Sequence, residues 1–172
     1  SDLGALRPQK LPKVPLACPE ARRSPQGKLL LATASWNLHG QMCWNNPATL
    51  KRLIQGACLV NGEKAKPDVF VFCFQEFTEL SASNVVLLST GDAVRMASFE
   101  AKAQAELATQ LGEAFLAVRS VGMVGLLVSV FVSERLAPSI RAVSGERIRS
   151  GLYGQAGNKG AVVVTFKVEE TS

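Results

Sequence analysis

A glycine-rich segment near the end of the chain carries the residue types that bind phosphate groups. Residues 150–160 read Ser-Gly-Leu-Tyr-Gly-Gln-Ala-Gly-Asn-Lys-Gly, and they close on the tetrad Gly157, Asn158, Lys159 and Gly160. Glycine permits positive φ and close backbone approach, so the N–H groups of such a loop can point at an anion. Lys159 adds a positive charge, and Asn158 adds directional hydrogen bonds. The segment therefore predicts a phosphate-binding loop; the alternative is a glycine-rich connection between strands that binds nothing.

Two polar residues stand at the ends of predicted buried strands. Asn37 follows the apolar run 29–35, and Glu76 follows the run 68–74. Polar groups in that position are costly unless they are satisfied, and ligands gather at strand ends in layered α/β proteins. A carboxylate beside an amide suits Mg²⁺, which takes one or two carboxylates together with water and substrate phosphate. The competing interpretation is structural, with Glu76 capping a turn and Asn37 holding a loop.

The hydrophobic pattern indicates the elements that must position these residues. Between the two predicted strands, a helix begins at Asn46-Pro47 and runs to about Leu59, which makes a βαβ-like unit. Residues 64–67 are expected to be a polar connection. A second helix is predicted over 92–112, followed by strands over 115–120, 125–132, 140–148 and 161–168. This order of elements predicts an α/β fold.

Four further polar residues lie near the predicted site. Arg141, Arg147 and Arg149 alternate along the strand before the glycine-rich segment and are predicted to point outward. They either line the mouth of the site and attract phosphate or form an ordinary solvated strand face. The single histidine, His39, lies two residues after Asn37 and is either a general base or a loop residue with ordinary hydrogen bonds.

The charge and cysteine content limit the classes of partner. The net charge of the chain is +5, and residues 1–28 contain six basic and two acidic residues. The rest of the chain is therefore nearly neutral, and no nucleic-acid partner is expected. Five of the eight prolines also fall in residues 1–28, which predicts a linker or extended arm, with a contact to anionic lipid as the alternative. The four cysteines lack zinc-site spacing, and no apolar run is long enough to cross a membrane. A cytoplasmic location is predicted, with the cytosolic face of membranes as a variant of it.

Four motifs occur in an order that resembles a known family. They are Ser35-Trp-Asn-Leu-His-Gly40, Phe74-Gln-Glu-Phe77, Val121-Gly-Met-Val-Gly-Leu-Leu127 and Gly151-Leu-Tyr-Gly-Gln-Ala-Gly-Asn-Lys-Gly160. This set is similar to the inositol polyphosphate 5-phosphatases of the endonuclease/exonuclease/phosphatase superfamily, and the last motif is its most specific part. The resemblance implies a DNase I-like α/β/β/α sandwich, of which residues 29–172 supply only the N-terminal half, one sheet with flanking helices.

The resemblance also implies roles for the candidate residues. Glu76 matches the family's Mg²⁺-binding carboxylate, and Asn37 matches the amide beside the metal and the scissile phosphate. Gly157, Asn158, Lys159 and Gly160 match the segment on the substrate side, and Arg149 is assigned to the same side. The implied reaction is Mg²⁺-dependent removal of the 5-phosphate from phosphoinositides or soluble inositol polyphosphates. The sequence departs from the family pattern at His39, where Asn is frequent, and at Phe77, where Leu is usual.

Motifs of the second half of such a domain do not occur in the 172 residues, including those that carry its general base. The chain is therefore expected to be a fragment that needs the missing C-terminal half as a partner, and to be inactive and poorly folded alone. Two alternatives stay open. One is a metal-dependent nuclease or phosphodiesterase of the same fold, and the other is a non-catalytic interaction fragment.

Overall fold

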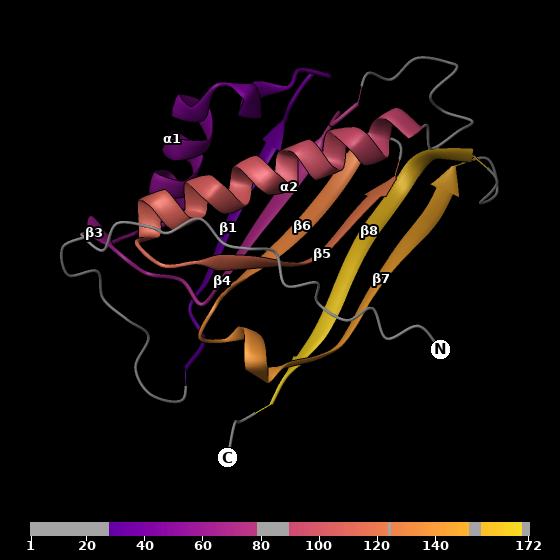
Figure 1. Cartoon of the computed structure of the whole chain (residues 1–172). Coiled ribbons are helices and arrows are strands. Elements are labelled where there is room, and N and C mark those ends of the chain that lie inside the picture. Colours follow the sequence, from indigo (N-terminus) through magenta and orange to yellow (C-terminus); the bar gives the residue numbers. More distant parts are fainter. Residues whose placement is uncertain (1–27, 79–89, 124, 152–155, 170–172) are drawn as a thin grey trace.

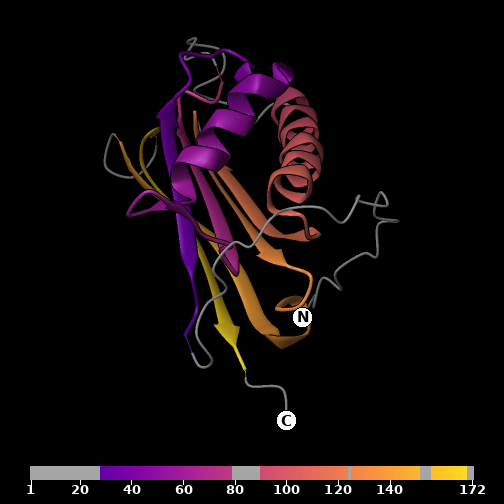
Figure 2. The same cartoon turned by 90° about the vertical axis from the view of Figure 1, so that its left-hand side faces the viewer.

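A four-stranded sheet lies at the centre of the molecule in the computed structural model, which describes residues 28–78, 90–123, 125–151 and 156–169. Its strand order is β1-β4-β6-β5, with bounds Leu31–Asn37, Val69–Gln75, Leu126–Ser133 and Phe115–Met123. Two helices, α1 (Pro47–Ala57) and α2 (Thr90–Leu111), cover one face, and a hairpin of β7 (Ile140–Gly151) and β8 (Ala156–Val168) lies on the other (Figures 1 and 2). The predicted α/β class is confirmed, while residues 1–27, including nearly all of the predicted basic tail, lie outside the described residues.

The predicted βαβ unit is confirmed, since β1 and β4 pair in parallel and α1 connects them. Asn46 caps α1, because its side-chain oxygen accepts a hydrogen bond from the Ala48 N–H at 3.0 Å, and Pro47 occupies the first turn. Leu50 and Ile54 form the buried face of this helix. The parallel pairing brings the carboxyl ends of β1 and β4 to the same edge of the sheet.

A short hairpin precedes the polar connection expected before β4 and takes up its first residue, Lys64. The strands β2 (Leu59–Val60) and β3 (Glu63–Lys64) pair antiparallel across Asn61 and Gly62, whose φ angles are 52° and 81°. Positive φ at both central residues is the requirement of a type I′ turn, which Asn-Gly satisfies. The Asn-Gly pair is therefore a hairpin signal in this sequence.

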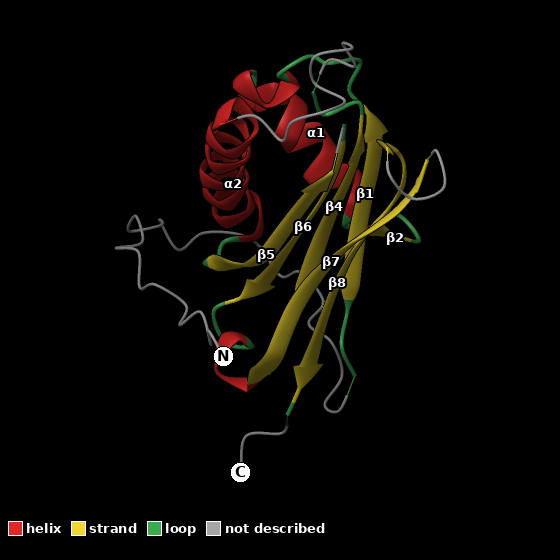
Figure 3. Ribbon diagram, turned by 90° about the vertical axis from the view of Figure 1, so that its right-hand side faces the viewer, coloured by secondary structure: helices red, strands yellow, loops and turns green. Residues whose placement is uncertain are grey.

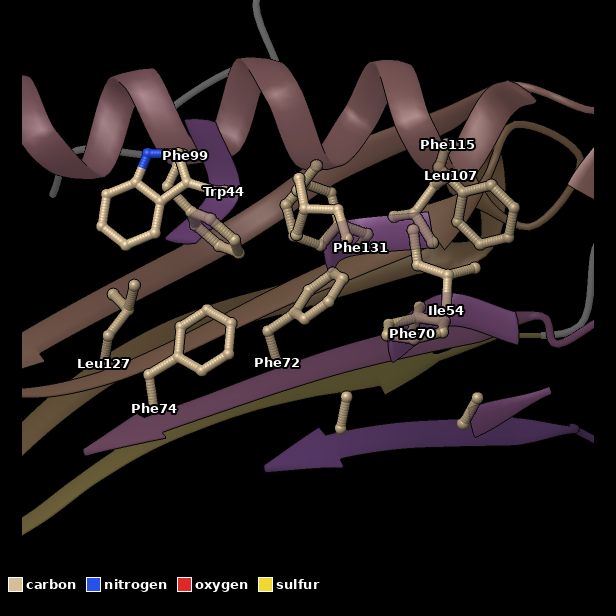
Figure 4. Close-up of a cluster of buried hydrophobic side chains, with 14 of the residues drawn as sticks. Trp44, Ile54, Phe70, Phe72, Phe74, Phe99, Leu107, Phe115, Leu127 and Phe131 are labelled. Carbon is tan, nitrogen blue, oxygen red and sulfur yellow. The ribbon is translucent and has the colours of Figure 1, made fainter. Parts of the chain in front are cut away.

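The main core lies between the sheet and the helices and is built from aromatic rings. Phe70, Phe72 and Phe74 of β4 point to the helices from alternate positions, and each is at most 2% exposed (Figure 4). Phe99 of α2 is fully buried and lies edge-on to Phe72 and Phe74, with ring centroids 5.3 and 5.1 Å apart. Trp44, from the 3-10 helix η1 (Cys43–Asn45), completes the cluster. This packing fixes α2 against the sheet end that carries Glu76.

The β7–β8 hairpin forms a second sheet that packs on β5 and β6. The expectation of one sheet is therefore wrong for the last two strands. Val164 and Phe166 of β8 pack with Val130 and Ile140 in a smaller apolar cluster. The hairpin does not extend over β1, where Leu31 is 57% exposed. This part of the sheet face therefore stays open, and Trp36 of β1 is also 38% exposed.

The three cysteines in the described part of the chain are free thiols. Burial raises the pKa of the Cys58 thiol to about 11, and it also raises the pKa of Cys43 and Cys73. These thiols therefore stay protonated at neutral pH and are poor nucleophiles. Within the described residues, neither helix is both long and apolar enough to cross a membrane.

Candidate functional site

Asn37 and Glu76 lie in direct contact at the edge of the sheet. Asn37 is level with Gln75 in the parallel register, so Glu76 begins the turn just beyond it. The Asn37 Nδ2 group donates a hydrogen bond to Glu76 Oε1 at 2.8 Å. Glu76 has a φ of 48°, a left-handed conformation that turns the chain sharply after β4. The predicted meeting of these two strand-end residues is confirmed, and their chemical roles stay a prediction.

His39 completes this group. Its backbone N–H donates to Asn37 Oδ1 at 3.0 Å, and its Nδ1 lies 3.3 Å from Glu76 Oε2. The side chain of His39 is 76% exposed, and that of Glu76 is 36% exposed. The amide of Asn37 is therefore oriented from both ends, by the His39 N–H on its oxygen and by the Glu76 carboxylate on its nitrogen. Each oxygen of the Glu76 carboxylate contacts one of these side chains, Asn37 or His39, and the carboxylate is still exposed to solvent.

The donor set can supply part of a metal site. Glu76 forms no ion pair with lysine or arginine in the described part of the chain. In that same part, no cluster of three or more His, Cys, Asp or Glu side chains could hold a metal ion. One carboxylate with adjacent polar groups fits Mg²⁺, because that ion keeps several waters and binds substrate phosphate. Glu76 would provide the protein's charged ligand in such a site.

Arg95 of α2, which sequence reasoning missed, fastens the loop that carries His39. Its guanidinium lies over the Trp44 ring at 5.2 Å and over the Phe77 ring at 5.5 Å, and its Nη2 donates to the Gly40 carbonyl. Trp44 and Phe77 stack with centroids 4.9 Å apart. Because Phe77 is aromatic, the residue after Glu76 joins this stack. Only the fold reveals this role, since Arg95 is far in sequence from both strand ends.

Replacing Arg95 by methionine is expected to loosen the loop beside Glu76. The variant loses the contact with Gly40 and two cation–π contacts, which together contribute on the order of 1–2 kcal/mol. Amide hydrogen exchange should become faster at Gly40, whose N–H donates to the Glu76 carbonyl at 2.8 Å. The matched control is Arg52→Met, on the exposed side of α1. Equal exchange rates at Gly40 in both variants would show that Arg95 does not hold this loop.

The glycine-rich segment is not a continuous loop as predicted. Gly151 ends β7, and Gly157, Asn158, Lys159 and Gly160 belong to β8. Residues 152–155 and the side chains of 157–159 lie outside what the structure describes. At Gly160, an added Cβ would fall 1.9 Å from the Ile148 carbonyl oxygen and 2.6 Å from the Met123 side chain. Gly160 is therefore required for close packing of β8 on β7 and β5.

The end of β7 and the start of β8 lie at the same end of the molecule as the carboxyl ends of β1 and β4 (Figure 3), the strands that end at Asn37 and Gln75. Met123, beside Gly160, pairs with Leu126 at the start of β6, and Leu127 pairs with Phe74 near the end of β4. The Phe77 N–H also donates to the Gly125 carbonyl at 2.8 Å. The topology therefore brings the backbone of the tetrad to the sheet end that carries the Asn37–Glu76 pair.

Arg147 does not point outward as predicted. Its Nε donates to the Gly122 carbonyl of β5 at 2.6 Å, so the side chain faces the main sheet. The cause is an extra residue in β7 between Arg141 and Ser144, where Ala142 has a φ of 50°. A bulge of this kind reverses the alternation of side chains beyond it. Arg141 precedes the bulge, stays exposed and forms an ion pair with Glu169. Arg149 lies opposite Gly160 in the strand register and, like Arg147, follows the bulge.

Comparisons with known proteins agree with this architecture. Residues 34–172 match the family described as Endonuclease/Exonuclease/phosphatase family 2. Human synaptojanin-2 is 28% identical over 155 residues, which cover 84% of this chain and 10% of that protein. The polyphosphatidylinositol phosphatase INP53 of Saccharomyces cerevisiae is 34% identical over 111 residues, which cover 64% of this chain and 10% of that protein.

A solved structure shows the same fold. The crystal structure of the inositol polyphosphate 5-phosphatase domain of SPsynaptojanin, in complex with inositol (1,4)-bisphosphate and calcium, superposes with a TM-score of 0.59 at 26% identity. The match covers 81% of this chain and 36% of that one, and the chain spans about a tenth of the curated relatives. The chain belongs to the endonuclease/exonuclease/phosphatase family 2, as a member that resembles the inositol polyphosphate 5-phosphatases.

Proposed function

We propose that this chain forms the metal-binding part of a Mg²⁺-dependent phosphatase that removes the 5-phosphate from phosphoinositides or soluble inositol polyphosphates. The observation that carries the proposal is the 2.8 Å contact between Asn37 and Glu76 at the sheet end to which the glycine-rich hairpin points. The relatives named as phosphatidylinositol or inositol polyphosphate phosphatases supply the substrate class. Because the chain spans a small part of each relative, the activity is proposed for a protein that contains the whole domain.

Each residue of the site has a proposed task. Glu76 would hold the cation through its carboxylate, and Asn37, oriented by the His39 N–H, would direct its amide at a phosphoryl oxygen. When bound, Mg²⁺ neutralises charge on the phosphoryl group and lowers the pKa of a coordinated water. Gly157, Asn158, Lys159, Gly160 and Arg149 are proposed to bind the phosphates of the inositol ring. His39 is exposed and touches Glu76, so its proposed task is to position that carboxylate.

The proposed setting follows from the substrates. Residues 29–172 are proposed as one half of a catalytic domain, preceded by the basic, proline-rich segment 1–28. A cytosolic protein with peripheral access to membranes would meet both lipid and soluble headgroups. A second candidate function is a non-catalytic phosphate-binding fragment. Two observations keep this candidate open: the described residues contain no metal cluster of three ligands, and the whole chain contains one histidine.

The test is position-specific phosphate release. The chain, alone and completed by the C-terminal half of a related domain, is incubated with a 5-phosphorylated inositol phosphate and Mg²⁺, and the products are followed by ³¹P NMR. Loss of the 5-phosphate from the completed protein only, abolished by a chelator, is the expected result. Metal-dependent binding without turnover in either form supports the non-catalytic function. A parallel incubation contains a phosphodiester substrate, and its cleavage without release of the 5-phosphate would overturn the proposal in favour of a nuclease or phosphodiesterase.

A further inference from the structure

An open hollow between β5 and β7 is lined by arginines from both strands. Its volume is about 500 Å³. Its walls are formed by Arg119, Ser120 and Val121 of β5 and by Gly145, Arg147 and Arg149 of β7. The bulge in β7 produces this arrangement, because it turns Arg147 and Arg149 toward β5.

The positive charge in the hollow is not balanced by the described residues. Arg135 and Arg141 pair with Asp68 and Glu169, but no ion pair is formed by the three arginines of the hollow within the described ranges. By alternation, Glu146 lies on the other face of β7. Three guanidinium groups that share one hollow repel each other unless an anion joins them. A guanidinium also presents five N–H donors in a planar fork, which matches the oxygens of a phosphate.

Gly145 makes the convergence of the arginines possible. A Cβ at this position would lie 2.4 Å from Val121 Cγ2 and 3.0 Å from Arg119 Nε. Glycine therefore lets β7 approach β5 closely enough for Arg119 and Arg147 to face the same space. Arg147 uses one donor on the Gly122 carbonyl, which fixes its stem and leaves the end of its guanidinium directed at the hollow.

The hollow is separate from the Asn37–Glu76 pair. In the strand order β1-β4-β6-β5, β5 lies two strands from β4. At about 4.8 Å between neighbouring strands, the two sites are therefore roughly 10 Å apart across the sheet. The Glu76 carboxylate is too distant to balance the charge of these arginines, and a phosphate bound between them is too distant to coordinate a cation held by Glu76.

We propose that this hollow binds a phosphate monoester of a phosphorylated inositol at a site apart from the metal-binding pair. The three arginines are the evidence that a phosphate binds here. That the phosphate is carried by an inositol ring rests on the proposed function. The same phosphate can belong to a soluble inositol phosphate or to the headgroup of a lipid. In both cases the hollow retains the headgroup through a phosphate that is not hydrolysed.

The test removes two of the charges and keeps Arg147, which bonds to the sheet. The double variant Arg119→Gln/Arg149→Gln is compared with Lys51→Gln/Arg52→Gln, which removes the same charge from the exposed side of α1. Isothermal titration with inositol bisphosphate is carried out in a chelator, so that no metal site contributes. The expected result is that the Kd rises about tenfold or more in the first variant and by less than about twofold in the control.

A second arm identifies the source of the phosphate. Vesicles of phosphatidylcholine that contain a phosphoinositide are compared with vesicles in which phosphatidylserine supplies the same charge, using sedimentation to measure binding. Weaker binding of the first variant to phosphoinositide vesicles alone assigns the site to the lipid headgroup, and weaker binding of inositol bisphosphate alone assigns it to the soluble form. Equal binding of both probes by wild type and variant, or no binding by either, overturns the proposal.

The two proposals fail in different ways. Glu76→Gln is expected to leave the titration in chelator unchanged, because Glu76 is not part of the hollow. If the 5-phosphate is never released but the arginine-dependent binding persists, the proposed function is wrong and the hollow is still a phosphate site. Thermal unfolding of each variant checks that the substituted proteins are folded, and a variant that is unfolded is replaced by the single substitution Arg119→Gln.

Discussion

Glu76→Gln is expected to lower the affinity of the chain for Mg²⁺ or Mn²⁺ by about a hundredfold or more. Even outer-shell partners of metal ligands contribute about tenfold to a hundredfold, and Glu76 is the carboxylate at the centre of the described site. Glutamine keeps an oxygen that can accept the hydrogen bond from Asn37 Nδ2, so the drop in metal affinity reports the removal of the negative charge. The measurement is Mn²⁺ binding followed by the paramagnetic resonance signal of the free ion, with Mg²⁺ as competitor.

A matched substitution separates the site from general electrostatics. Glu134→Gln removes an exposed carboxylate that follows β6 at the opposite end of the sheet, and it should leave Mn²⁺ binding unchanged. Asn37→Ala is expected to have an intermediate effect of about tenfold to a hundredfold, the range for a residue that orients a ligand. If wild type and Glu76→Gln bind Mn²⁺ equally, Glu76 is not a metal ligand and the proposed metal-dependent reaction at this site is wrong.

Phe99→Ala is expected to destabilise the fold by about 3–5 kcal/mol. The Phe99 ring is fully buried and contacts five other aromatic rings, those of Trp44, Phe72, Phe74, Phe77 and Phe131. Truncation removes this apolar area from the core and leaves a cavity between α2 and the sheet. A loss of that size is a large fraction of the roughly 5–15 kcal/mol that stabilises a typical domain. Urea denaturation followed by circular dichroism gives the change in the free energy of unfolding.

Two comparisons at α2 make this result specific. Phe99→Leu fills most of the space and should cost less than about 1.5 kcal/mol. Val94 is 68% exposed on the same helix, so Val94→Ala should stay within about 0.5 kcal/mol of wild type. If Phe99→Ala unfolds at the wild-type urea concentration, α2 is not packed on the aromatic core as described, and the role of Arg95 in holding the loop is also wrong.

The parts of the structure that follow a local pattern were predictable from the sequence. The apolar run of β4 and the Asn46-Pro47 start of α1 each depend on neighbours within a few residues. The contact between Asn37 and Glu76 was also predictable, because polar residues that follow neighbouring parallel strands meet at one edge. The sequence thus indicated the centre of the site, although it did not show that His39 would contact Glu76.

The features that depend on long-range packing were not predictable in the same way. Arg95 reaches Gly40 across 55 positions in the sequence, and no local signal marks that contact. The extra residue between Arg141 and Ser144 inverts the facing of Arg147, and strict alternation gave the wrong side. The separation of β7 and β8 from the main sheet likewise depends on tertiary packing, since the sequence of one strand does not determine which strand it pairs with.

The left-handed backbone at Glu76 has a consequence for the evolution of this chain. A non-glycine residue at a φ of 48° carries a penalty of about 1 kcal/mol that glycine at the same position would largely avoid. A search guided by thermal tolerance alone would therefore favour the substitution Glu76→Gly, and it would discard the carboxylate together with the strain. If Glu76 binds the cation as proposed, the acidic side chain at this position is a compromise in which chemistry has outweighed stability.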